Sequence, residues 1–411
     1  MRVVVIGGGA AGFFTAINIA EKTPKATITL LERSNKLLHK VQISGGGRCN
    51  VTNARTKPSE LVPFYPRGNK KLYPAFKKFS SDDMRSWLAH RGVAIKAEED
   101  HRCFPISDSS QTIIDCFVEL ADKYSIRILK QQTWTDLVQY GREWIVITKE
   151  ERIITDFVIV ATGSSPSSWK ILERIGLKVT KPVPSLFTFR INDSRIKELQ
   201  GISFPAAQVK VAGTKLQEEG ALLITHWGLS GPAVLKLSSW GAYQLEEIDY
   251  QFKILINFIS KKPEAALGDL MRYKQQNAQR TVSKYPMWDV PRRFWERMLE
   301  NVLPNTSMCY AELSKKHVNK IVEELTQGMY QVTGKSAFKE EFVTAGGIHL
   351  SEIDLTTYEA KRFPGLFAVG EVMDIDALTG GFNFQACWTG GWIISEYLSK
   401  TVLDPLTQGN A

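Results

Sequence analysis

The stretch that decides the fold is VVVIGGGAAGFF, residues 3–14. Four apolar, mostly β-branched residues run into a glycine cluster, and apolar residues at helical spacing continue to Lys22, shortly before Pro24. This pattern predicts a buried strand, a tight turn and a helix. A second apolar run, ATITLLE at residues 26–32, completes a strand–helix–strand unit, which is typical of an α/β fold with a parallel sheet.

The glycines of this turn have the spacing G-x-G-x-x-G at Gly7, Gly9 and Gly12. The first makes the tight turn, the second lets backbone approach a pyrophosphate, and the third lets helix pack on strand. Glu32 ends the second strand, where a carboxylate accepts ribose hydroxyls and repels a 2′-phosphate. The sequence therefore predicts a dinucleotide site that does not hold NADP; the alternative is a glycine turn kept for packing. Only one such motif is present, so one resident dinucleotide is expected.

Three further motifs have the composition of cofactor loops. KVQISGGGRCNVTN (40–53) offers three successive glycines, an arginine for phosphate charge and short polar side chains. VIVATGSSP (158–166) is a buried strand that ends in small residues. FAVGEVMDIDALTGGFNFQACWTGG (367–391) combines a strand, acidic residues and a glycine pair before a helix. Strand ends in open α/β sheets bind ligands, so we expect these loops to meet around the dinucleotide.

Between these motifs the pattern changes twice. Residues 34–70 are predicted as a long connection, followed by helices at 82–91 and 110–124 and strands at 126–138 and 143–149. Short alternating runs between 182 and 259 predict an antiparallel barrel or sandwich, and 263–325 is predicted as helical. The expected domains are a split nucleotide domain (1–182 and 340–411), a β-barrel substrate domain (183–260 and 326–339) and a helical insert (261–325).

Composition narrows the function classes. The 411 residues are 43% hydrophobic and 23% charged, a globular profile without a run of about 20 apolar residues. The formal charge is +9, but Lys and Arg are spread along the chain, so neither nucleic acid nor membrane is expected as a partner. Five scattered cysteines and six scattered histidines indicate reduced thiols and no metal site. The N-terminus does not have the layout of a signal peptide, and we expect a cytoplasmic protein.

The motifs together resemble the BaiN-like, aminoacetone-oxidase-like family of flavoproteins. VIGGGAAG, SGGGRCNVTN, HRCFPISDSS, HWGLSGPAVLKLSS, VTAGGIHLSEID and GLFAVGEVMDIDALTGGFNFQACWTGG occur in order across nearly the whole chain. The resemblance implies a Rossmann-like FAD/NAD(P)-binding domain of the glutathione-reductase type, with an inserted β-barrel that carries a helical insert. It also implies non-covalent FAD. The chain departs from the family after ATG, where ATGSSPSSWKILERIGLKV is shorter and serine-rich.

The resemblance also implies which residues hold FAD. Gly7, Gly9 and Gly12 would hold the pyrophosphate, Glu32 the adenosine ribose, and Asp374 would face the ribityl–phosphate portion. Trp134 would contact the adenine through backbone, and Gly381, Asn383 and Gln385 would lie by the isoalloxazine ring. The remaining expected cofactor-binding residues are Ala10, Ala11, Arg33, Lys40, Ser44, Gly45, Gly46, Gly47, Arg48, Cys49, Asn50, Ala161, Thr162, Gly163, Gly370 and Glu371.

The expected function is an FAD-dependent oxidoreductase acting on a small or medium organic substrate. The resemblance offers amine or ketone oxidation and enone C=C reduction by hydride transfer at flavin N5, with NAD(P)H as a candidate transient electron donor. The alternatives are a flavoprotein that acts on tRNA and an FAD-binding protein without turnover. No catalytic residue is assigned: His226 and His349 lie nearest the matched motifs, but a structural role is favoured for each, and Cys49 is expected to pack against FAD.

Overall fold

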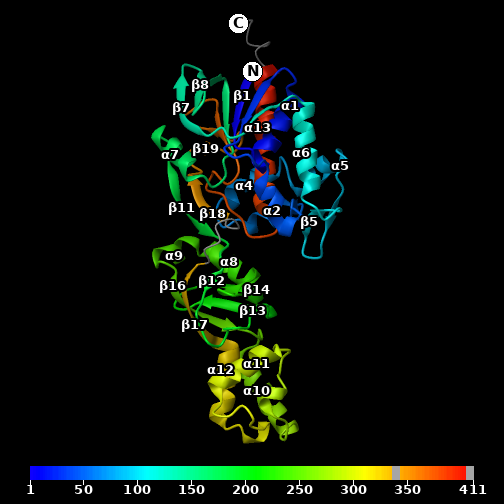
Figure 1. Cartoon of the computed structure of the whole chain (residues 1–411), viewed down its shortest axis with the longest axis vertical. Coiled ribbons are helices and arrows are strands. Elements are labelled where there is room, and N and C mark those ends of the chain that lie inside the picture. Colours follow the sequence, from blue (N-terminus) through cyan, green and yellow to red (C-terminus); the bar gives the residue numbers. More distant parts are fainter. Residues whose placement is uncertain (336–342, 404–411) are drawn as a thin grey trace. The chain divides into compact units, whose positions relative to one another are not determined.

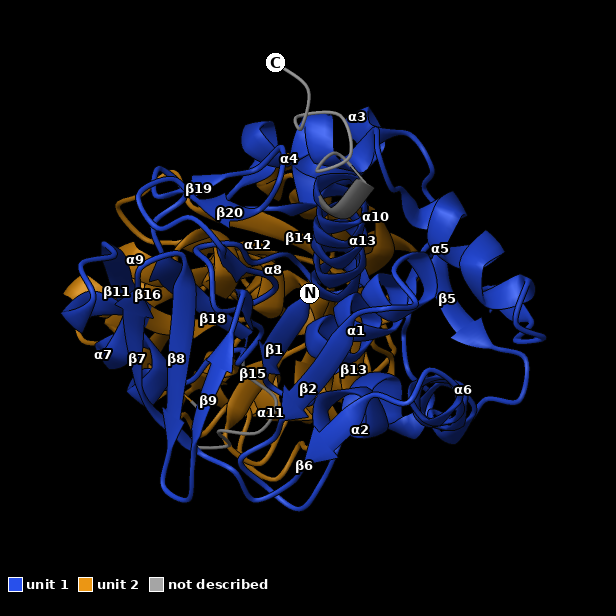
Figure 2. Ribbon diagram, turned by 90° about the horizontal axis from the view of Figure 1, so that it is seen from above, with its two compact units in different colours: residues 1–182, 343–411 blue, residues 183–342 orange. Residues whose placement is uncertain are grey.

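The computed structural model describes residues 1–335 and 343–403. The chain divides into two compact units, Met1–Pro182 with Val343–Ala411 and Val183–Phe342 (Figure 2). The second unit therefore interrupts the first in sequence. The predicted change of domain at 339–340 lies outside the described residues, and the finer division of the second unit into a barrel domain and a helical domain stays a prediction.

A seven-stranded sheet forms the centre of the first unit. Val4, in the central one of the five parallel strands, pairs with Val158 on one side and Thr29 on the other. Parallel strands end at the same edge, so the loops after β1, β2, β10 and β21 meet at one carboxyl edge. The order is β19 (Ile353–Asp354), β20 (Glu359–Ala360), β21 (Leu366–Ala368), β10 (Phe157–Val160), β1 (Arg2–Ile6), β2 (Thr27–Leu31) and β6 (Arg127–Leu129), with β19 and β20 antiparallel.

Helices cover one face of this sheet and a small antiparallel sheet covers the other (Figures 1 and 2). Phe14 of the first helix packs against Trp388 of the last, with ring centroids 5.2 Å apart. Full burial of such a side chain contributes about 1.5–3 kcal/mol, so this helix pair is a large part of the core. The helices are α1 (Ala10–Lys22), α6 (Gln111–Lys123) and α13 (Phe382–Leu403), and the opposing strands are β7 (Trp134–Tyr140), β8 (Glu143–Thr148) and β9 (Arg152–Thr155).

Two sequence-based assignments in the first unit need correction. The stretch 34–70 is not one long connection, because short helices form there. They span only a few residues each, too few for apolar periodicity to stand out. The strand predicted at 126–138 is two strands of different sheets, β6 and β7, separated at Gln131, which has φ +57°. The elements of 34–70 are α2 (His39–Gly47), β3 (Thr52–Asn53), α3 (Pro58–Leu61), η1 (Val62–Phe64) and α4 (Asn69–Phe76).

The other predicted helices of this unit are confirmed. The pattern at 82–91 forms α5, and the pattern at 110–124 forms α6. A further helix was not predicted either: the serine-rich segment after Gly163 forms α7, with Ser165 Oγ accepting from Ser168 N at its start. The remaining elements are α5 (Ser81–Ala89), β4 (Ile95–Ala97), β5 (Arg102–Pro105), α7 (Pro166–Arg174), β11 (Val179–Ser185) and β18 (Val343–Ile348).

The second unit contains a closed antiparallel barrel, which confirms the expected inserted barrel. Its strands alternate buried and exposed residues, as in β16, where Phe252, Ile254 and Ile256 point inward. The barrel order is β12 (Phe189–Arg190), β15 (Gly228–Ser230), β14 (Gln217–Ile224), β13 (Ser203–Val211), β16 (Gln251–Asn257) and β17 (Gly328–Lys335).

Helices complete the second unit. The segment 263–325 is helical as predicted, with Phe294 and Trp295 buried in its core. Two helices within 182–259 were not predicted, because PAVLKLSSW was included in the strand-like run. The helices are α8 (Pro232–Trp240), α9 (Ala242–Glu247), α10 (Pro263–Gln276), η2 (Val282–Lys284), α11 (Arg292–Val302), η3 (Tyr310–Glu312) and α12 (Lys315–Gln327).

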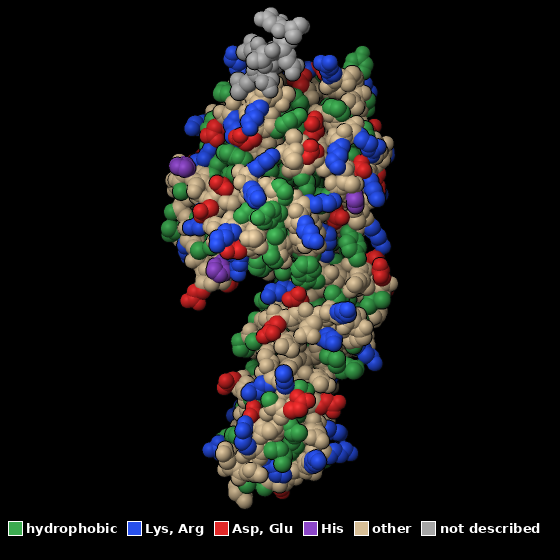
Figure 3. All heavy atoms as spheres, turned by 180° about the vertical axis from the view of Figure 1, so that it is seen from behind, with side chains coloured by type: hydrophobic (Ala, Val, Ile, Leu, Met, Phe, Trp, Pro, Cys, Tyr) green, Lys and Arg blue, Asp and Glu red, His purple; other side chains and the backbone are tan. Residues whose placement is uncertain are grey.

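Over the described ranges, not one helix combines the length and apolar character needed to span a bilayer. On the face drawn in Figure 3, Lys and Arg side chains are interspersed with Asp and Glu on both units.

Candidate cofactor site

The turn between β1 and α1 has two glycines fixed by packing and one that faces open space. A Cβ on Gly12 would lie 1.9 Å from the Gly7 carbonyl oxygen, and a Cβ on Gly7 would lie 2.4 Å from the Ala161 oxygen. A Cβ on Gly9, by contrast, would meet nothing within 4 Å. Gly9 is the N-cap of α1, and neither a side chain nor an acidic residue occupies this helix start. Its free amides and positive dipole end fit a phosphate group.

Glu32 is held beside this turn at the end of β2. Its two carboxylate oxygens accept from Gly8 N at 2.9 Å and from Ser34 N at 2.8 Å. Each oxygen keeps a further lone pair, so the carboxylate can still accept ribose hydroxyls. Arg33, the next residue, is exposed. The geometry of Glu32 thus fits its predicted role.

The end of β10 supplies an unpaired polar atom. Ala161 N donates to Ile6 O, which holds the strand end against β1. Among the described residues the buried hydroxyl of Thr162 has no hydrogen-bond partner, and Gly163 follows with φ +59°. A buried hydroxyl without a partner costs about 1–3 kcal/mol, so a bound group that supplied one would stabilise this edge. The open space at Gly9 and the orphan at Thr162 both fit a nucleotide cofactor.

Trp134 is tied to the serine-rich segment. Its indole nitrogen donates to Ser168 Oγ at 3.1 Å, and its side chain is buried. The side chain is thus committed to packing at α7, which agrees with an adenine contact through backbone only. That contact stays a prediction.

The glycine loop 44–50 interrupts α2 and exposes backbone. Gly45, Gly46 and Gly47 have φ of +59°, +68° and +85°, and a Cβ on either of the last two would meet nothing within 4 Å. Ser44 Oγ donates to Val41 O, and Ser44 O accepts from Cys49 N, which closes the loop. This leaves the glycine backbone free to approach a ligand.

The side chains of Arg48 and Cys49 are both engaged within the protein, the first in an ion pair and the second in the core. The Arg48 guanidinium pairs with Glu98 at 2.7 Å and lies 4.0 Å over the Phe104 ring, so its predicted role toward phosphate stays a prediction. Burial raises the pKa of the Cys49 thiol to about 12. A thiol with such a pKa is not a nucleophile near neutral pH, which agrees with the expected packing role.

Lys40 and the segment 370–374 meet across the sheet edge. Lys40 Nζ forms an ion pair with Glu371 and lies 3.3 Å from Ser164 Oγ. Asp374 Oδ1 accepts from Gly346 N at 3.1 Å. Gly370 has φ +80°, and a Cβ added at this position would lie 3.1 Å from both Ala11 Cβ and Cys387 Sγ. Loops from both ends of the chain therefore line one edge.

The start of α13 is braced by buried polar contacts. A Cβ on Gly381 would lie 2.3 Å from the Thr52 carbonyl oxygen. With the Asn50 amide oriented to satisfy both neighbours, its oxygen accepts from Gly381 N at 3.0 Å. The Asn383 side chain bonds both backbone groups of Ala377, at 2.9 and 3.0 Å. Gln385 is buried, and its Oε1 accepts from Thr52 Oγ1 at 2.6 Å. These side chains thus position the helix start.

Sequence reasoning missed part of this brace. Tyr65 OH donates to Phe382 O at 2.6 Å, and Arg67 pairs with the fully buried Asp376. These pairs join segments more than 300 residues apart, so spacing could not reveal them. The only signal was the pair of aspartates in MDIDALTGG, of which the resemblance assigned only Asp374.

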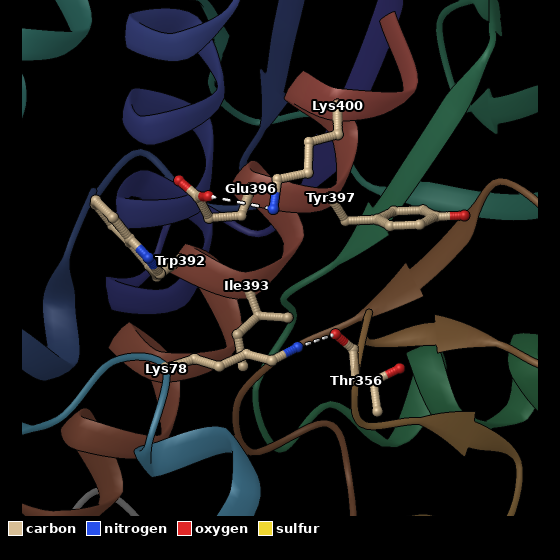
Figure 4. Close-up of a pocket in the computed structure, with 7 residues that line it drawn as sticks. All are labelled: Lys78, Thr356, Trp392, Ile393, Glu396, Tyr397 and Lys400. Atoms are coloured by element: carbon tan, nitrogen blue, oxygen red, sulfur yellow. Dashed lines mark hydrogen bonds and ion pairs between the residues drawn. The ribbon is translucent and has the colours of Figure 1, made fainter. Parts of the chain in front are cut away.

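Two of the pockets within the described part of the first unit differ in their relation to the predicted site. One, of about 330 Å³, is lined by Asp374, His349 and the basic start of α4, and His349 Nδ1 is 2.6 Å from Ser351 Oγ. The other, of about 390 Å³, lies along the later turns of α13 and contains none of the predicted cofactor residues (Figure 4). Its lining residues are Lys78, Thr356, Trp392, Ile393, Glu396, Tyr397 and Lys400. Of the residues predicted to hold the cofactor, Asp374 lines the first pocket and none lines the second.

Comparisons with known proteins agree with this architecture. A family model described as HI0933-like protein Rossmann domain matches residues 1–397. A ribosomal RNA dihydrouridine synthase of Escherichia coli K12 is 27% identical over 409 residues, covering 96% of this chain and 97% of the relative. A second protein of that name, from Haemophilus influenzae Rd, is also 27% identical, over 412 residues, covering 97% of this chain and 98% of the relative. A 3-dehydro-bile acid delta(4,6)-reductase of Clostridium scindens is 22% identical over 406 residues, covering 95% of this chain and 97% of the relative.

Among solved structures, the 3-ketosteroid-delta4-(5alpha)-dehydrogenase of Rhodococcus jostii RHA1 in complex with 4-androstene-3,17-dione has a TM-score of 0.51 at 14% identity, covering 96% of both chains. At such identity the likeness shows the fold alone. It is the fold of an FAD-type Rossmann domain that carries a second domain.

Proposed function

The chain belongs to the HI0933-like Rossmann family, a family of FAD-dependent flavoproteins, and on that premise we propose that it reduces a carbonyl-conjugated C=C bond with FAD. The main supporting observation is the carboxyl edge of the sheet. There the uncapped start of α1, the hydrogen-bonded carboxylate of Glu32 and the buried, unpartnered hydroxyl of Thr162 are found together among the described residues. These features fit the dinucleotide part of FAD. The family resemblance drawn from the sequence motifs is confirmed by the family match.

The names of the relatives support the choice of reduction. Dihydrouridine is uridine whose C5–C6 double bond, conjugated to a carbonyl, has been saturated. A 3-dehydro-bile acid delta(4,6)-reductase is named for reducing ring double bonds in a ketone. Both reactions add a hydride and a proton to an activated double bond. Of the two chemistries that the sequence left open, enone-type reduction has this support, and oxidation of amines has none.

The residues of the carboxyl edge would divide the work of holding FAD. The first-turn amides of α1 and the open approach at Gly9 would bind the pyrophosphate, and Glu32 would accept the ribose hydroxyls. The Thr162 hydroxyl would gain the partner that it lacks. The start of α13, held by Asn383 and Gln385, would direct its dipole at negative charge on the pyrimidine edge of the ring. When bound, reduced FAD supplies the hydride.

Within this substrate class we propose a uracil base in RNA as the first candidate and a steroid-like ring enone as the second. The two relatives named for ribosomal RNA each align over more than nine-tenths of this chain. The formal charge of +9 is compatible with a polyanionic substrate. This proposal departs from the sequence-based expectation that nucleic acid is not a partner.

A spectrum and an anaerobic reoxidation assay test the proposal. The purified protein should show a bound flavin, and NADH and NADPH should be titrated separately to identify the donor. Reduced protein should then be reoxidised without oxygen by oligouridine or by a 4-en-3-one steroid, with a product heavier by two hydrogens. A protein without flavin, or one whose reduced flavin is reoxidised by oxygen but by neither substrate, would contradict it.

A further inference from the structure

Residues 33–78 are almost free of acidic side chains. Lys and Arg are spread along the sequence, but residues 33–78 contain eleven of them and a single acidic side chain, Glu60. This segment, which we call the basic segment, contains the glycine loop of the cofactor site and ends just after α4. Its net charge of +10 exceeds the formal charge of the whole protein, +9.

Part of this charge is not neutralised within the protein. Arg48 pairs with Glu98 and Arg67 with Asp376, but Lys70 and Lys71 at the start of α4 are exposed and form no ion pair with any residue in 1–335 or 343–403. Lys77, at the end of α4, contacts only an aromatic ring among the partners found in those ranges. Three exposed ammonium groups within residues 70–77, unpaired among the described residues, make the local electrostatic potential more positive.

Two of these lysines share a face of the helix with an aromatic side chain. Lys70, Tyr73 and Lys77 stand at i, i+3 and i+7 of α4, which places them on the same side. Tyr73 is 37% exposed, and Lys77 Nζ lies 4.8 Å from its ring centroid. Phosphate-binding cations beside an exposed ring are the elements with which proteins bind single-stranded nucleic acid.

This face borders the pocket that is also lined by Asp374, a residue predicted to face the cofactor. The pocket of about 330 Å³ is lined by Arg67, Lys70 and Lys71 together with His349 and Asp374. Helix α4 is tied to the start of α13 through Tyr65, whose hydroxyl donates to Phe382 O, and through the pair of Arg67 with Asp376. A polyanion on α4 would therefore lie next to the residues expected to face the flavin.

We propose that the α4 surface, made by the Lys70, Tyr73 and Lys77 face together with Lys71 at the pocket, binds the phosphate backbone of a single-stranded RNA substrate. Phosphates would contact the three lysines, a base would stack on Tyr73, and the neighbouring base would reach the pocket at Asp374. The inference rests on the proposed function for the identity of the polyanion, but its binding test does not depend on turnover.

The test measures binding of a labelled oligouridine to FAD-loaded protein by fluorescence anisotropy over a range of salt concentrations. Each lost phosphate contact should weaken binding about fivefold at about 0.1 M salt and flatten the salt slope by about 0.7. Lys70→Glu with Lys71→Glu should thus weaken binding about 25-fold, and Lys77→Glu alone about fivefold. The matched control is Arg142→Glu with Lys149→Glu, two exposed cations in the same unit with the same charge change.

The flavin spectrum separates the two proposals. Unchanged FAD content with weakened RNA binding in the α4 variants, and wild-type binding in the control, supports the α4 surface even if no substrate is reduced. Binding by the α4 double variant within about twofold of the control, or an absence of salt-dependent binding by the wild-type holoprotein, overturns it.

Discussion

The two helices that begin at the carboxyl edge, α1 and α13, are held at their first turns in opposite ways. At α1, Gly9 faces open space, and the helix start has no side-chain cap. At α13, a Cβ on Gly381 would collide with the backbone of Thr52, and Asn383 is bonded to Ala377. An open helix start can receive an anion from solution, whereas a braced one can only hold its dipole in place. The pyrophosphate of FAD would thus be bound by free backbone amides at α1, and its flavin ring would lie at the fixed helix dipole of α13.

The largest effect is expected at the packed glycine of the open helix. Gly12→Ala puts a methyl 1.9 Å from the Gly7 oxygen, so β1 and α1 must separate. We expect a loss of about 3 kcal/mol or more in the free energy of unfolding, together with loss of FAD. Denaturant unfolding of the apoprotein and FAD titration measure both quantities.

Gly9→Ala is the matched change in the same turn. Its methyl meets nothing, so the apoprotein should unfold within about 1 kcal/mol of wild type. FAD should nonetheless bind at least about tenfold more weakly, because the methyl occupies the phosphate approach. If Gly9→Ala binds FAD as wild type does, the α1 start is not the open phosphate site.

Gly381→Ala should break the braced helix start. The residue has φ +87°, and the new methyl would lie 2.3 Å from the Thr52 oxygen. We expect a loss of about 3 kcal/mol in unfolding free energy. Gly92→Ala has a similar φ of +76° but no atom within 4 Å, so it should cost only about 1 kcal/mol. Equal losses in the two variants would mean that the brace at Thr52 adds nothing.

Thr52→Val should loosen the brace without changing its shape. The Gln385 oxygen would lose its hydroxyl donor in a fully buried position, at a cost of about 2 kcal/mol. Thr52→Ser keeps the donor and should recover most of this loss. Thermal unfolding of the three proteins gives the comparison, and a midpoint for Thr52→Val that matches Thr52→Ser would contradict a role for the bond.

The smallest effect concerns pH. Burial raises the pKa of Cys49 from 9.0 to about 12, so the folded state keeps this proton to higher pH than the unfolded state. Its contribution to stability is complete below pH 9 and is lost as pH rises from 9 towards 12.

Between about pH 8 and about pH 10 the wild type should therefore lose about 1.4 kcal/mol more unfolding free energy than Cys49→Ala. Cys309→Ala, which removes a partly exposed thiol of the second unit, is the control and should keep the wild-type slope. Parallel pH profiles for wild type and Cys49→Ala would show that the Cys49 thiol is not the group responsible.

The same contrast explains what the sequence could predict. The α1 start was predicted residue by residue, because Gly7, Gly9, Gly12 and Glu32 act within one strand–helix–strand unit. The α13 start was predicted only as a cofactor neighbour through resemblance. Its contacts join Thr52 to Gln385 across 333 positions, and no local pattern encodes such a pairing. The short helices of 34–70 were missed for a related reason, since their stability comes from packing and not from their own periodicity.

The order in which the chain is synthesised gives the α1–α13 pair a further consequence. Helix α1 is synthesised before the second unit, yet Phe14 packs against Trp388, which is made only after the entire second unit. Until then the aromatic face of α1 lacks this covering, so the nascent protein exposes apolar surface while the second unit is being synthesised. A chain that stops before Phe382 would keep that surface for good, which makes such truncated products natural clients of chaperones and proteases.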